Sequence, residues 1–226
     1  MSTAIYLLVA AVPIGLGFAA RFWVSAVFRK ADLVPAASGA TGLQAARQLL
    51  AGGCPGVTVE TVDGELTDHY DPRAHAVRLS EGVAESTSVA ALAVVAHEVG
   101  HVIQDQTRDR TFRFQRTVVP VASFCSYGWI VAIGAGILLE SAGFLVLAVM
   151  LFAGVAAFHL ATLPVELGAS RQALSLLAAE GLVTAGELPV ARRVLRAAAF
   201  TYLVAALVAI TELARIALEI ALSAED

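Results

Sequence analysis

Long apolar runs without a charged side chain dominate this chain and predict helices that cross a membrane. Three of these runs reach the roughly 17 to 25 residues that a bilayer requires, namely 2–20, 117–139 and 141–165. A fourth run, 197–211, is shorter and continues into a segment with Glu212, Arg215 and Glu219 on one helical face. We predict that 197–226 forms a fourth span and a tail, with a helix on the membrane surface as the alternative.

The polar segment after the first run has a different periodicity and predicts a small folded domain. Residues 31–53 predict a loop followed by a helix, which Ser38 or Thr41 can cap and the Gly52–Gly53 pair ends. Apolar and polar residues then alternate around Val57, Val59 and Val62, and again over 76–79, with a break at the Asp63–Gly64 pair, as in a small sheet or hairpin.

A second helix of this domain is predicted from Ser86 or Ser88, which can cap it, to about Gln106. Its first half is rich in Ala and Val on every face, up to His97, so we expect it to be buried against other elements.

Composition supports the membrane interpretation. The 226 residues are 58% hydrophobic and 15% charged, whereas a soluble domain has roughly 45–50% and about 25%. The gap excludes an ordinary water-soluble enzyme. The net charge of −4 gives no reason to expect a nucleic-acid partner.

Basic residues near the ends of spans mark the cytoplasmic side. They follow the first run, precede the second and separate the third from the fourth: Arg21, Arg29, Lys30, Arg108, Arg110, Arg113, Arg116, Arg171, Arg192, Arg193 and Arg196. The turn at Glu140 carries none. Both large polar segments are therefore expected in the cytoplasm, and the first run is a retained anchor, because no basic residue precedes it as in a signal peptide.

These patterns predict a mainly α, polytopic helical membrane protein with a small α+β cytoplasmic domain. The expected segments are an anchor at 1–28, a cytoplasmic domain at 29–116, a transmembrane hairpin at 117–165, a cytoplasmic segment at 166–196, and the fourth span or surface helix with a tail at 197–226.

The predicted second helix contains the stretch "AHEVGH", which indicates a metal site. His97 and His101 are four residues apart, so both imidazoles lie on one helical face, about 6 Å apart along the axis. Glu98 lies about 100° around the helix, where its carboxylate can take a proton from a water that the metal activates. This is the H-E-x-x-H arrangement of zinc peptidases, and burying Glu98 without a partner would cost several kcal/mol.

A catalytic zinc site usually has a third protein ligand. The expected topology returns the chain to the cytoplasm at "LPVELGASRQA", so Glu166 is a candidate, together with Asp105, Glu180 and Glu187. Position alone does not choose among them, because a glutamate at a helix start is also favoured by the helix dipole without any metal.

Three stretches together resemble the YugP-type family of bacterial membrane zinc metallopeptidases: "DHYDPRAHAVRLSEGV", "AHEVGHVIQ" and "TLPVELGASRQAL". The resemblance covers about 38–173 and the order of the elements. It implies a zincin-like, more specifically gluzincin-like, site with Zn²⁺ held by His97, His101 and Glu166, and with Glu98 as general base. The chain departs from the pattern at Gly168, where an aspartate or asparagine is expected, which weakens any hydrogen bond to a ligand from that position.

Other residues near the motifs have two interpretations each. Asp71, before a proline, can fix a turn between strands, whereas the strand 76–79 could be an edge along which a substrate peptide adds. His69 or Tyr70 could stabilise an oxyanion. His159 falls on the face of Glu166 but is better explained by packing near the lipid boundary.

The sequence thus predicts a membrane-embedded zinc endopeptidase of the bacterial plasma membrane that cleaves protein or peptide substrates, membrane proteins among them, at the cytoplasmic face. Membrane lipid is an expected partner, and a homo-oligomer is compatible with the sequence. The alternative is a zinc-binding membrane adaptor or scaffold with little hydrolysis. Transport is a third hypothesis, suggested by Glu212 and Arg215.

Overall fold

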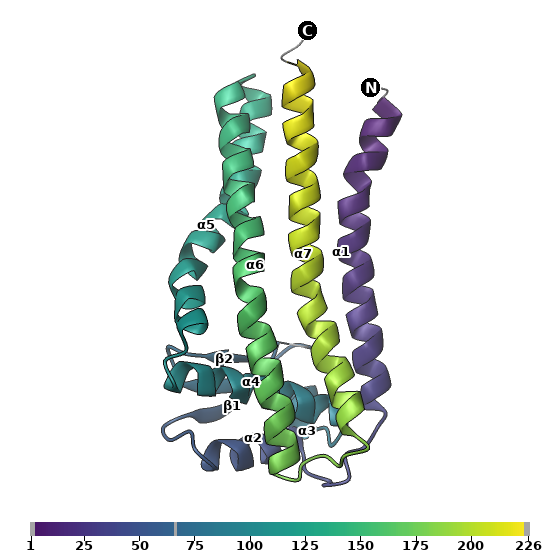
Figure 1. Ribbon diagram of the computed structural model, residues 1–226, viewed down its shortest axis with the longest axis vertical. Helices are drawn as coiled ribbons and strands as arrows, with labels where there is room; N and C mark the ends of the chain where they lie inside the picture. Colours follow the sequence, from purple (N-terminus) through teal and green to yellow (C-terminus); the bar gives the residue numbers. More distant parts are fainter. Residues whose placement is uncertain (1–2, 66, 224–226) are drawn as a thin grey trace. The chain divides into compact units, whose positions relative to one another are not determined.

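The computed structural model describes the backbone of residues 3–65 and 67–223 and the side chains of 15–65, 67–211 and 213–214. The chain is mainly helical in this part, with a small mixed sheet (Figure 1). The elements are α1 (Thr3–Asp32), α2 (Gly42–Ala51), β1 (Thr58–Val62), β2 (His69–Asp71), β3 (Ala76–Ser80), α3 (Glu81–Glu85), α4 (Val89–Gln106), α5 (Arg110–Leu138), α6 (Ala142–Ala179) and α7 (Leu188–Ser223). The predictions of a mainly α fold and a small α+β part are confirmed.

The chain divides into two compact units. We call Met1–Arg21, Phe114–Leu163 and Phe200–Asp226 the helical unit, and Phe22–Arg113 and Pro164–Ala199 the mixed unit. The chain passes from one unit to the other within α1, α5, α6 and α7. Each unit is therefore assembled from segments that are far apart in the sequence.

The sheet of the mixed unit has the order β1-β3-β2. β1 is parallel to β3, with Thr58 opposite Ala76, and β2 is antiparallel to β3, with Tyr70 opposite Val77. The strand at 76–79 is therefore central, and the alternative interpretation, in which it forms an edge for a substrate peptide, is wrong. Alternation along the sequence predicted a strand here but did not show that β1 and β2 would pair on either side of it. The outer strands are therefore β1 and β2.

The two predicted helices of this unit begin at the expected caps. The Thr41 side chain accepts a hydrogen bond from Gln44 N, and Gln44 Oε1 accepts one from Thr41 N, which is a complete capping box before α2. Ser88 Oγ accepts from Ala91 N and starts α4, which ends at Gln106 as predicted.

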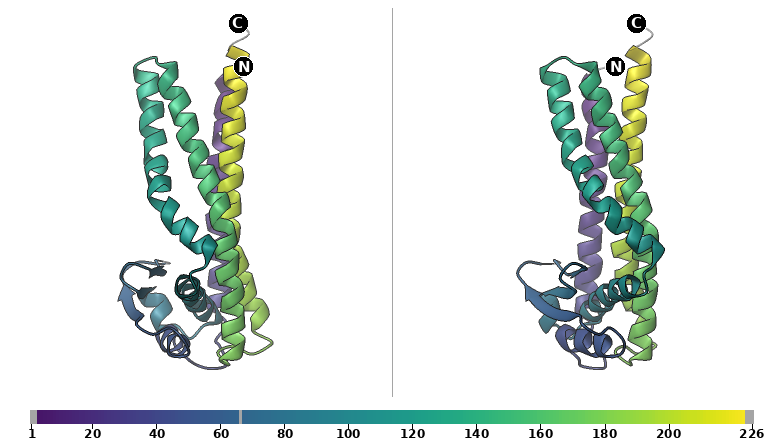
Figure 2. Two further views of the ribbon diagram at one scale, coloured as in Figure 1. Left: turned by 60° about the vertical axis from the view of Figure 1, so that its left-hand side comes forward. Right: turned by 90° about the vertical axis from the view of Figure 1, so that its left-hand side faces the viewer.

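The core of the mixed unit forms where α4 packs on the sheet and on the other helices. Its fully buried side chains come from β3, α4, α6 and α7 and include Val77, Leu79, Leu92, Val95, Val99, Leu177 and Ala191. Because α4 is apolar on most faces, it contacts β2 and β3 as well as α2 and α6 (Figure 2, left). This packing fixes the helix that carries the histidine pair.

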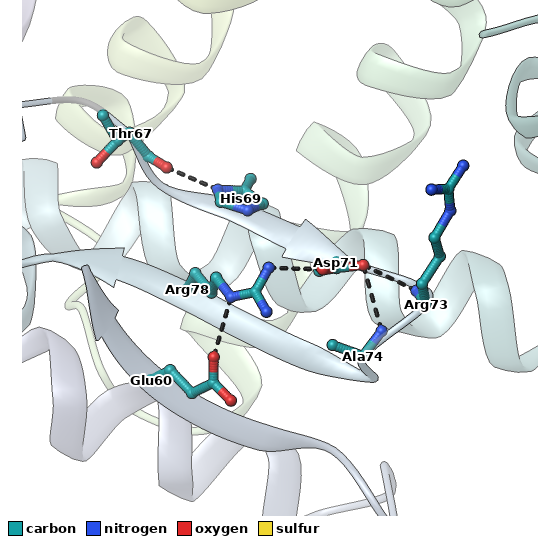
Figure 3. Close-up of polar contacts among 7 residues, drawn as sticks. All are labelled: Glu60, Thr67, His69, Asp71, Arg73, Ala74 and Arg78. Atoms are coloured by element: carbon teal, nitrogen blue, oxygen red, sulfur yellow. Dashed lines mark hydrogen bonds and ion pairs between the residues drawn. The ribbon is translucent and has the colours of Figure 1, made fainter. Parts of the chain in front are cut away.

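Asp71 closes the turn between β2 and β3, as its first interpretation predicted. Its Oδ1 accepts hydrogen bonds from Arg73 N and Ala74 N, and its Oδ2 accepts one of 2.5 Å from Arg78, which also pairs with Glu60 at 2.9 Å (Figure 3). These donors hold the pKa of Asp71 at about 2. The network thus joins all three strands on one face of the sheet.

In the helical unit, α5 and α6 run antiparallel on either side of the turn at Leu139–Ser141 (Figure 2). Among the described residues, three helical stretches are long and apolar enough to cross a membrane by length and composition, namely Arg110–Leu138, Ala142–Ala179 and Leu188–Thr211. They overlap the second, third and fourth predicted spans. The side chains of most of the first run, and of Glu212, Arg215 and Glu219, lie outside the described residues.

His159 lies in the helical unit, beside a cavity of about 530 Å³ that α1, α6 and α7 line. Its ring centroid is 6.5 Å from that of Tyr202, and its buried Nδ1 has no hydrogen-bond partner in the described part of the chain. It is not among the residues that gather at the candidate metal centre, in agreement with the packing interpretation.

Candidate metal centre

The two histidines of the motif face the same side of α4 in the mixed unit. His97 and His101 are partly buried, and their ring centroids are 4.7 Å apart in an edge-to-face arrangement. The His101 ring also stacks on Phe112, with 5.8 Å between centroids. The spacing of one helical turn therefore brings the two Nε2 atoms toward one point, as the sequence predicted.

Glu166 meets this point from α6. Its Oε2 lies 3.1 Å from His97 Nε2 and 3.7 Å from His101 Nε2. Glu166 is only 7% exposed and lies inside a helix that continues through Pro164, so it is not a solvated glutamate at a helix start. The structure excludes that interpretation and leaves the carboxylate facing the two imidazoles.

Two glycines allow α4 and α6 to come this close. A Cβ on Gly100 would lie 2.7 Å from the carbonyl oxygen and 3.1 Å from the Cα of Ala169, so the two backbones touch at this position. A Cβ on Gly168 would lie 2.8 Å from Gln104 Nε2. A residue larger than glycine at position 100 would push the helix that carries Glu166 away from the histidines, whereas at position 168 it would displace the end of the Gln104 side chain.

The other three candidates for a third ligand lie elsewhere in the mixed unit. Asp105 accepts a hydrogen bond from the Tyr70 hydroxyl, Glu180 accepts from Gln48, and Glu187 accepts from Ala37 N and Thr184 N. In the described part of the chain, His97, His101 and Glu166 each offer one ligand atom, and these atoms all lie within 4.8 Å of one another. Geometry thus favours Glu166.

Gln104 and Ser170 contact the outer ring nitrogens of the two histidines, and sequence reasoning missed both contacts. Gln104 Oε1 lies 2.9 Å from His101 Nδ1, and Ser170 Oγ lies 3.3 Å from His97 Nδ1. Both could have been found from helical spacing, because Gln104 is three residues after His101 and Ser170 is four residues after Glu166. Gln104, rather than a side chain at position 168, supplies the hydrogen bond expected near the ligands.

Glu98 points toward the sheet side of α4 and is 8% exposed. Its Oε2 accepts a 2.9 Å hydrogen bond from the backbone N–H of Tyr70, the middle residue of the outer strand β2. The Tyr70 hydroxyl is directed to Asp105, and His69 is on the opposite face, near Arg78 (Figure 3). The structure therefore brings neither the hydroxyl nor His69 to the histidine pair, and the oxyanion hypothesis gains no support.

The charges of the side chains at this point favour a bound cation. Burial raises the pKa of Glu98, although the neighbouring His97 and His101 act in the opposite direction. Burial would lower the pKa of His101, but the hydrogen bond to Glu166 and the charge of Glu98 outweigh it and raise that pKa to about 9. Two carboxylates beside two imidazoles thus attract positive charge strongly.

A zinc ion fits this donor set. Gln104 Oε1 can only accept a hydrogen bond, so His101 Nδ1 must donate it. In a neutral His101 the proton is therefore on Nδ1, and Nε2 keeps a lone pair that faces Glu166. Two Nε2 atoms and one carboxylate are a known ligand set of catalytic zinc, with hydrogen bonds to the outer ring nitrogens. The two negative charges of Glu98 and Glu166 would also balance the double positive charge of a zinc ion.

Comparison with known proteins agrees with this chemistry. The chain is 42% identical over 212 residues, 93% of either chain, to a protein of Bacillus subtilis (strain 168) named "Putative membrane protease YugP". No solved structure matches it significantly. Residues 5–221 match the family described as "Putative neutral zinc metallopeptidase". The chain therefore belongs to this family of zinc metallopeptidases, whose metal is Zn²⁺.

Proposed function

We propose that this chain is an integral-membrane zinc endopeptidase that cleaves peptide bonds at the cytoplasmic face of a bacterial plasma membrane. His97, His101 and Glu166 hold the metal, and Glu98 is the general base. The observation that carries the proposal is the position of Glu98. Its buried carboxylate accepts a hydrogen bond from the Tyr70 N–H, and the preceding residue in the chain, His97, has its Nε2 3.1 Å from Glu166 Oε2.

Each side chain has a distinct role in the reaction. When bound, Zn²⁺ polarises the scissile carbonyl and makes water more acidic. Glu98 accepts the proton of the attacking water and delivers it to the leaving amine, which its raised pKa favours. The Tyr70 N–H holds the Glu98 carboxylate in one orientation. The carboxylate therefore loses little conformational freedom when the substrate reacts.

The sheet offers a place for the substrate backbone. β2 is an outer strand, and its middle residue is bound to Glu98. An extended peptide that lies along β2 would therefore pass beside the general base; because the Tyr70 N–H stays bound to Glu98, the peptide would pair with the other backbone groups of this strand. This replaces the hypothesis of strand addition at β3.

The distribution of charge supports the proposed orientation, and the position of Glu166 beside an apolar run supports the proposed substrate class. The segments that we predicted to be cytoplasmic, 29–116 and 166–196, contain most of the arginines, whereas 117–165 contains none. Glu166 follows directly on the apolar run 141–165, which would place the catalytic residues near the lipid surface. Membrane proteins, and segments that emerge from them, are accordingly the proposed substrates.

Replacement of Glu98 tests the catalytic assignment. Casein cleavage by purified Glu98→Gln in detergent should fall about 10²–10⁴-fold, the usual contribution of a general base. Its zinc content should stay at the wild-type level. Glu85→Gln, which removes an exposed carboxylate of α3, is the matched control and should cleave like the wild type. If Glu98→Gln cleaves as fast as the wild type, the alternative of a zinc-binding adaptor is favoured.

Single cysteines test the orientation. In a variant with Cys54 and Cys125 replaced, a cysteine at Arg73 should resist a membrane-impermeant maleimide in intact cells, and one at Glu140 should react. Reaction at Arg73 and protection at Glu140 would contradict the cytoplasmic assignment while leaving the metal site untouched.

A further inference from the structure

One buried amide connects the two helices that form the metal centre. Gln104 is 2% exposed, and both ends of its side chain are used. Its Oε1 lies 2.9 Å from His101 Nδ1 on α4, and its Nε2 donates a 2.9 Å hydrogen bond to the carbonyl oxygen of Val165 on α6. Val165 directly precedes Glu166, so this side chain is bound at once to a histidine and to the backbone beside the carboxylate.

The amide is the functional group that this position requires. His101 Nδ1–H needs an acceptor, and the Val165 carbonyl, which lies within α6, can accept a second hydrogen bond through its other lone pair; an amide offers both partners. A carboxylate would leave the carbonyl facing a second acceptor, and an apolar side chain would leave the partly buried His101 Nδ1–H without the acceptor it has here.

The packing around Gln104 depends on two glycines. A Cβ at Gly168 would lie 2.8 Å from Gln104 Nε2, so the amide occupies the space next to α6 that a side chain there would need. One turn away on α4, Gly100 touches the backbone of Ala169. The short distance between the helices is therefore what allows one side chain to reach both.

We propose that Gln104 is a positioning residue for the metal: it fixes the Nδ1–H tautomer of His101 and, through Val165, the position of Glu166. It touches no reacting atom and acts through two ligands on different helices. The inference rests on the metal site of the proposed function but not on hydrolysis, so it can be tested by metal binding alone.

Ser170 provides an internal comparison. It lies 3.3 Å from His97 Nδ1 and orients one ligand, and its hydroxyl can donate or accept. Gln104 makes a shorter contact and is bound to both helices. Loss of Gln104 should therefore weaken the metal site more than loss of Ser170.

The test measures Zn²⁺ affinity of the purified full chain by competition with a chromophoric chelator. Gln104→Leu should bind Zn²⁺ about 10–100-fold more weakly, as is usual when a hydrogen bond to a ligand is removed. Gln104→Glu keeps an acceptor for His101 but loses the donor to Val165, and should lose less affinity than Gln104→Leu. Gln106→Leu, an exposed glutamine two residues along α4, is the matched control and should bind like the wild type.

Gly168→Ala gives an independent test, because it displaces the Gln104 amide without altering Gln104 or any ligand. It should weaken Zn²⁺ binding and change the visible absorption of the Co²⁺-substituted protein in the same direction as Gln104→Leu. The Co²⁺ spectrum reports ligand geometry, which a purely structural role of Gln104 would leave unchanged in folded protein.

The proposal is overturned if Gln104→Leu binds Zn²⁺ within about threefold of the wild type, or if Gln106→Leu is weakened as much. It is also overturned if Gly168→Ala is folded but has an unaltered Co²⁺ spectrum. Failure of the Glu98→Gln experiment would remove the peptidase activity from the proposed function and leave these binding results standing, so the two failures are distinguishable.

Discussion

The mixed unit keeps its large apolar side chains inside, whereas the helical unit exposes most of its own. Leu79, Leu92 and Val95 in the mixed unit are fully buried. In the helical unit, Leu138 is 83% and Tyr127 is 76% exposed, and all but four of the exposed large hydrophobic side chains among the described residues lie there. Such a surface is expected for helices whose solvent is the hydrocarbon of a bilayer.

Charge is divided in the same way. Twelve of the 15 Lys and Arg residues lie in the mixed unit, and among the described residues its carboxylates form the ion pairs of the sheet and the candidate metal centre. The stretch 117–163 has Glu140 as its single charged residue. The charges thus favour water around the mixed unit and apolar surroundings for the stretch 117–163.

The largest expected difference between the units comes from truncating one leucine in each. Leu92→Ala, in the core of the mixed unit, should lower the free energy of unfolding by about 2–5 kcal/mol. Leu138→Ala should change it by less than about 0.5 kcal/mol in detergent, because detergent replaces the lost contacts. Guanidinium unfolding, followed for each unit by hydrogen–deuterium exchange mass spectrometry, measures both. Equal losses would mean that Leu138 is covered by protein.

Removal of the metal should affect the mixed unit alone. At a free zinc concentration 100 times the Kd, binding stabilises the native state by about 2.7 kcal/mol, which a chelator should abolish. Amide exchange should then rise in α4 and β2 and stay unchanged in the stretch 117–163. Exchange that rises equally in both regions would show that the units unfold together.

Gly100→Ala should separate the two helices of the metal centre. The added Cβ overlaps the Ala169 backbone, so the free energy of unfolding should fall by about 1–3 kcal/mol and Zn²⁺ should bind more weakly. The matched control is Gly134→Ala in α5, where nothing lies within 4 Å of the added Cβ. The control should be neutral or slightly stabilised, since alanine favours helix more than glycine does. A neutral Gly100→Ala would contradict the close contact.

The smallest effect is expected from the ion pairs on the sheet. The pKa of Asp71 is lowered to about 2 by Arg73 N, Ala74 N and Arg78, against about 3.9 in an unfolded chain. Its contribution to stability is therefore complete above about pH 4 and is lost as the pH falls toward 2. The guanidinium midpoint of Asp71→Asn should depend less on pH over this range than that of the wild type. Asp63→Asn, outside the network, should follow the wild type.

Local patterns were enough to predict several elements and one half of the site. The caps at Thr41 and Ser88, the end of α4 at Gln106 and the convergence of His97 and His101 depend on residues within a turn of each other, where helix geometry fixes the spacing. The apolar runs likewise predicted the long helices, because their length is set by the membrane.

Contacts between distant segments could not be predicted in this way. The alternative interpretation of 76–79 as an edge failed because a strand pattern does not reveal which strands lie beside it, and β1 pairs with β3 only in the folded chain. Helical spacing could have shown that Gln104 contacts His101, but not that it also binds the Val165 carbonyl, 61 residues away.

By itself the sequence determined that two histidines share one face of a helix, that Glu98 accompanies them, and that much of the chain belongs in lipid. These properties follow from helical periodicity and from the length and charge of apolar runs. Residue spacing left Glu166, Asp105, Glu180 and Glu187 open as the third ligand, and the family resemblance implied Glu166; only the tertiary structure shows that Glu166 faces the pair. That choice depends on α4 and α6 touching at Gly100 and Ala169, and a close contact between helices is set by packing, which no local pattern encodes.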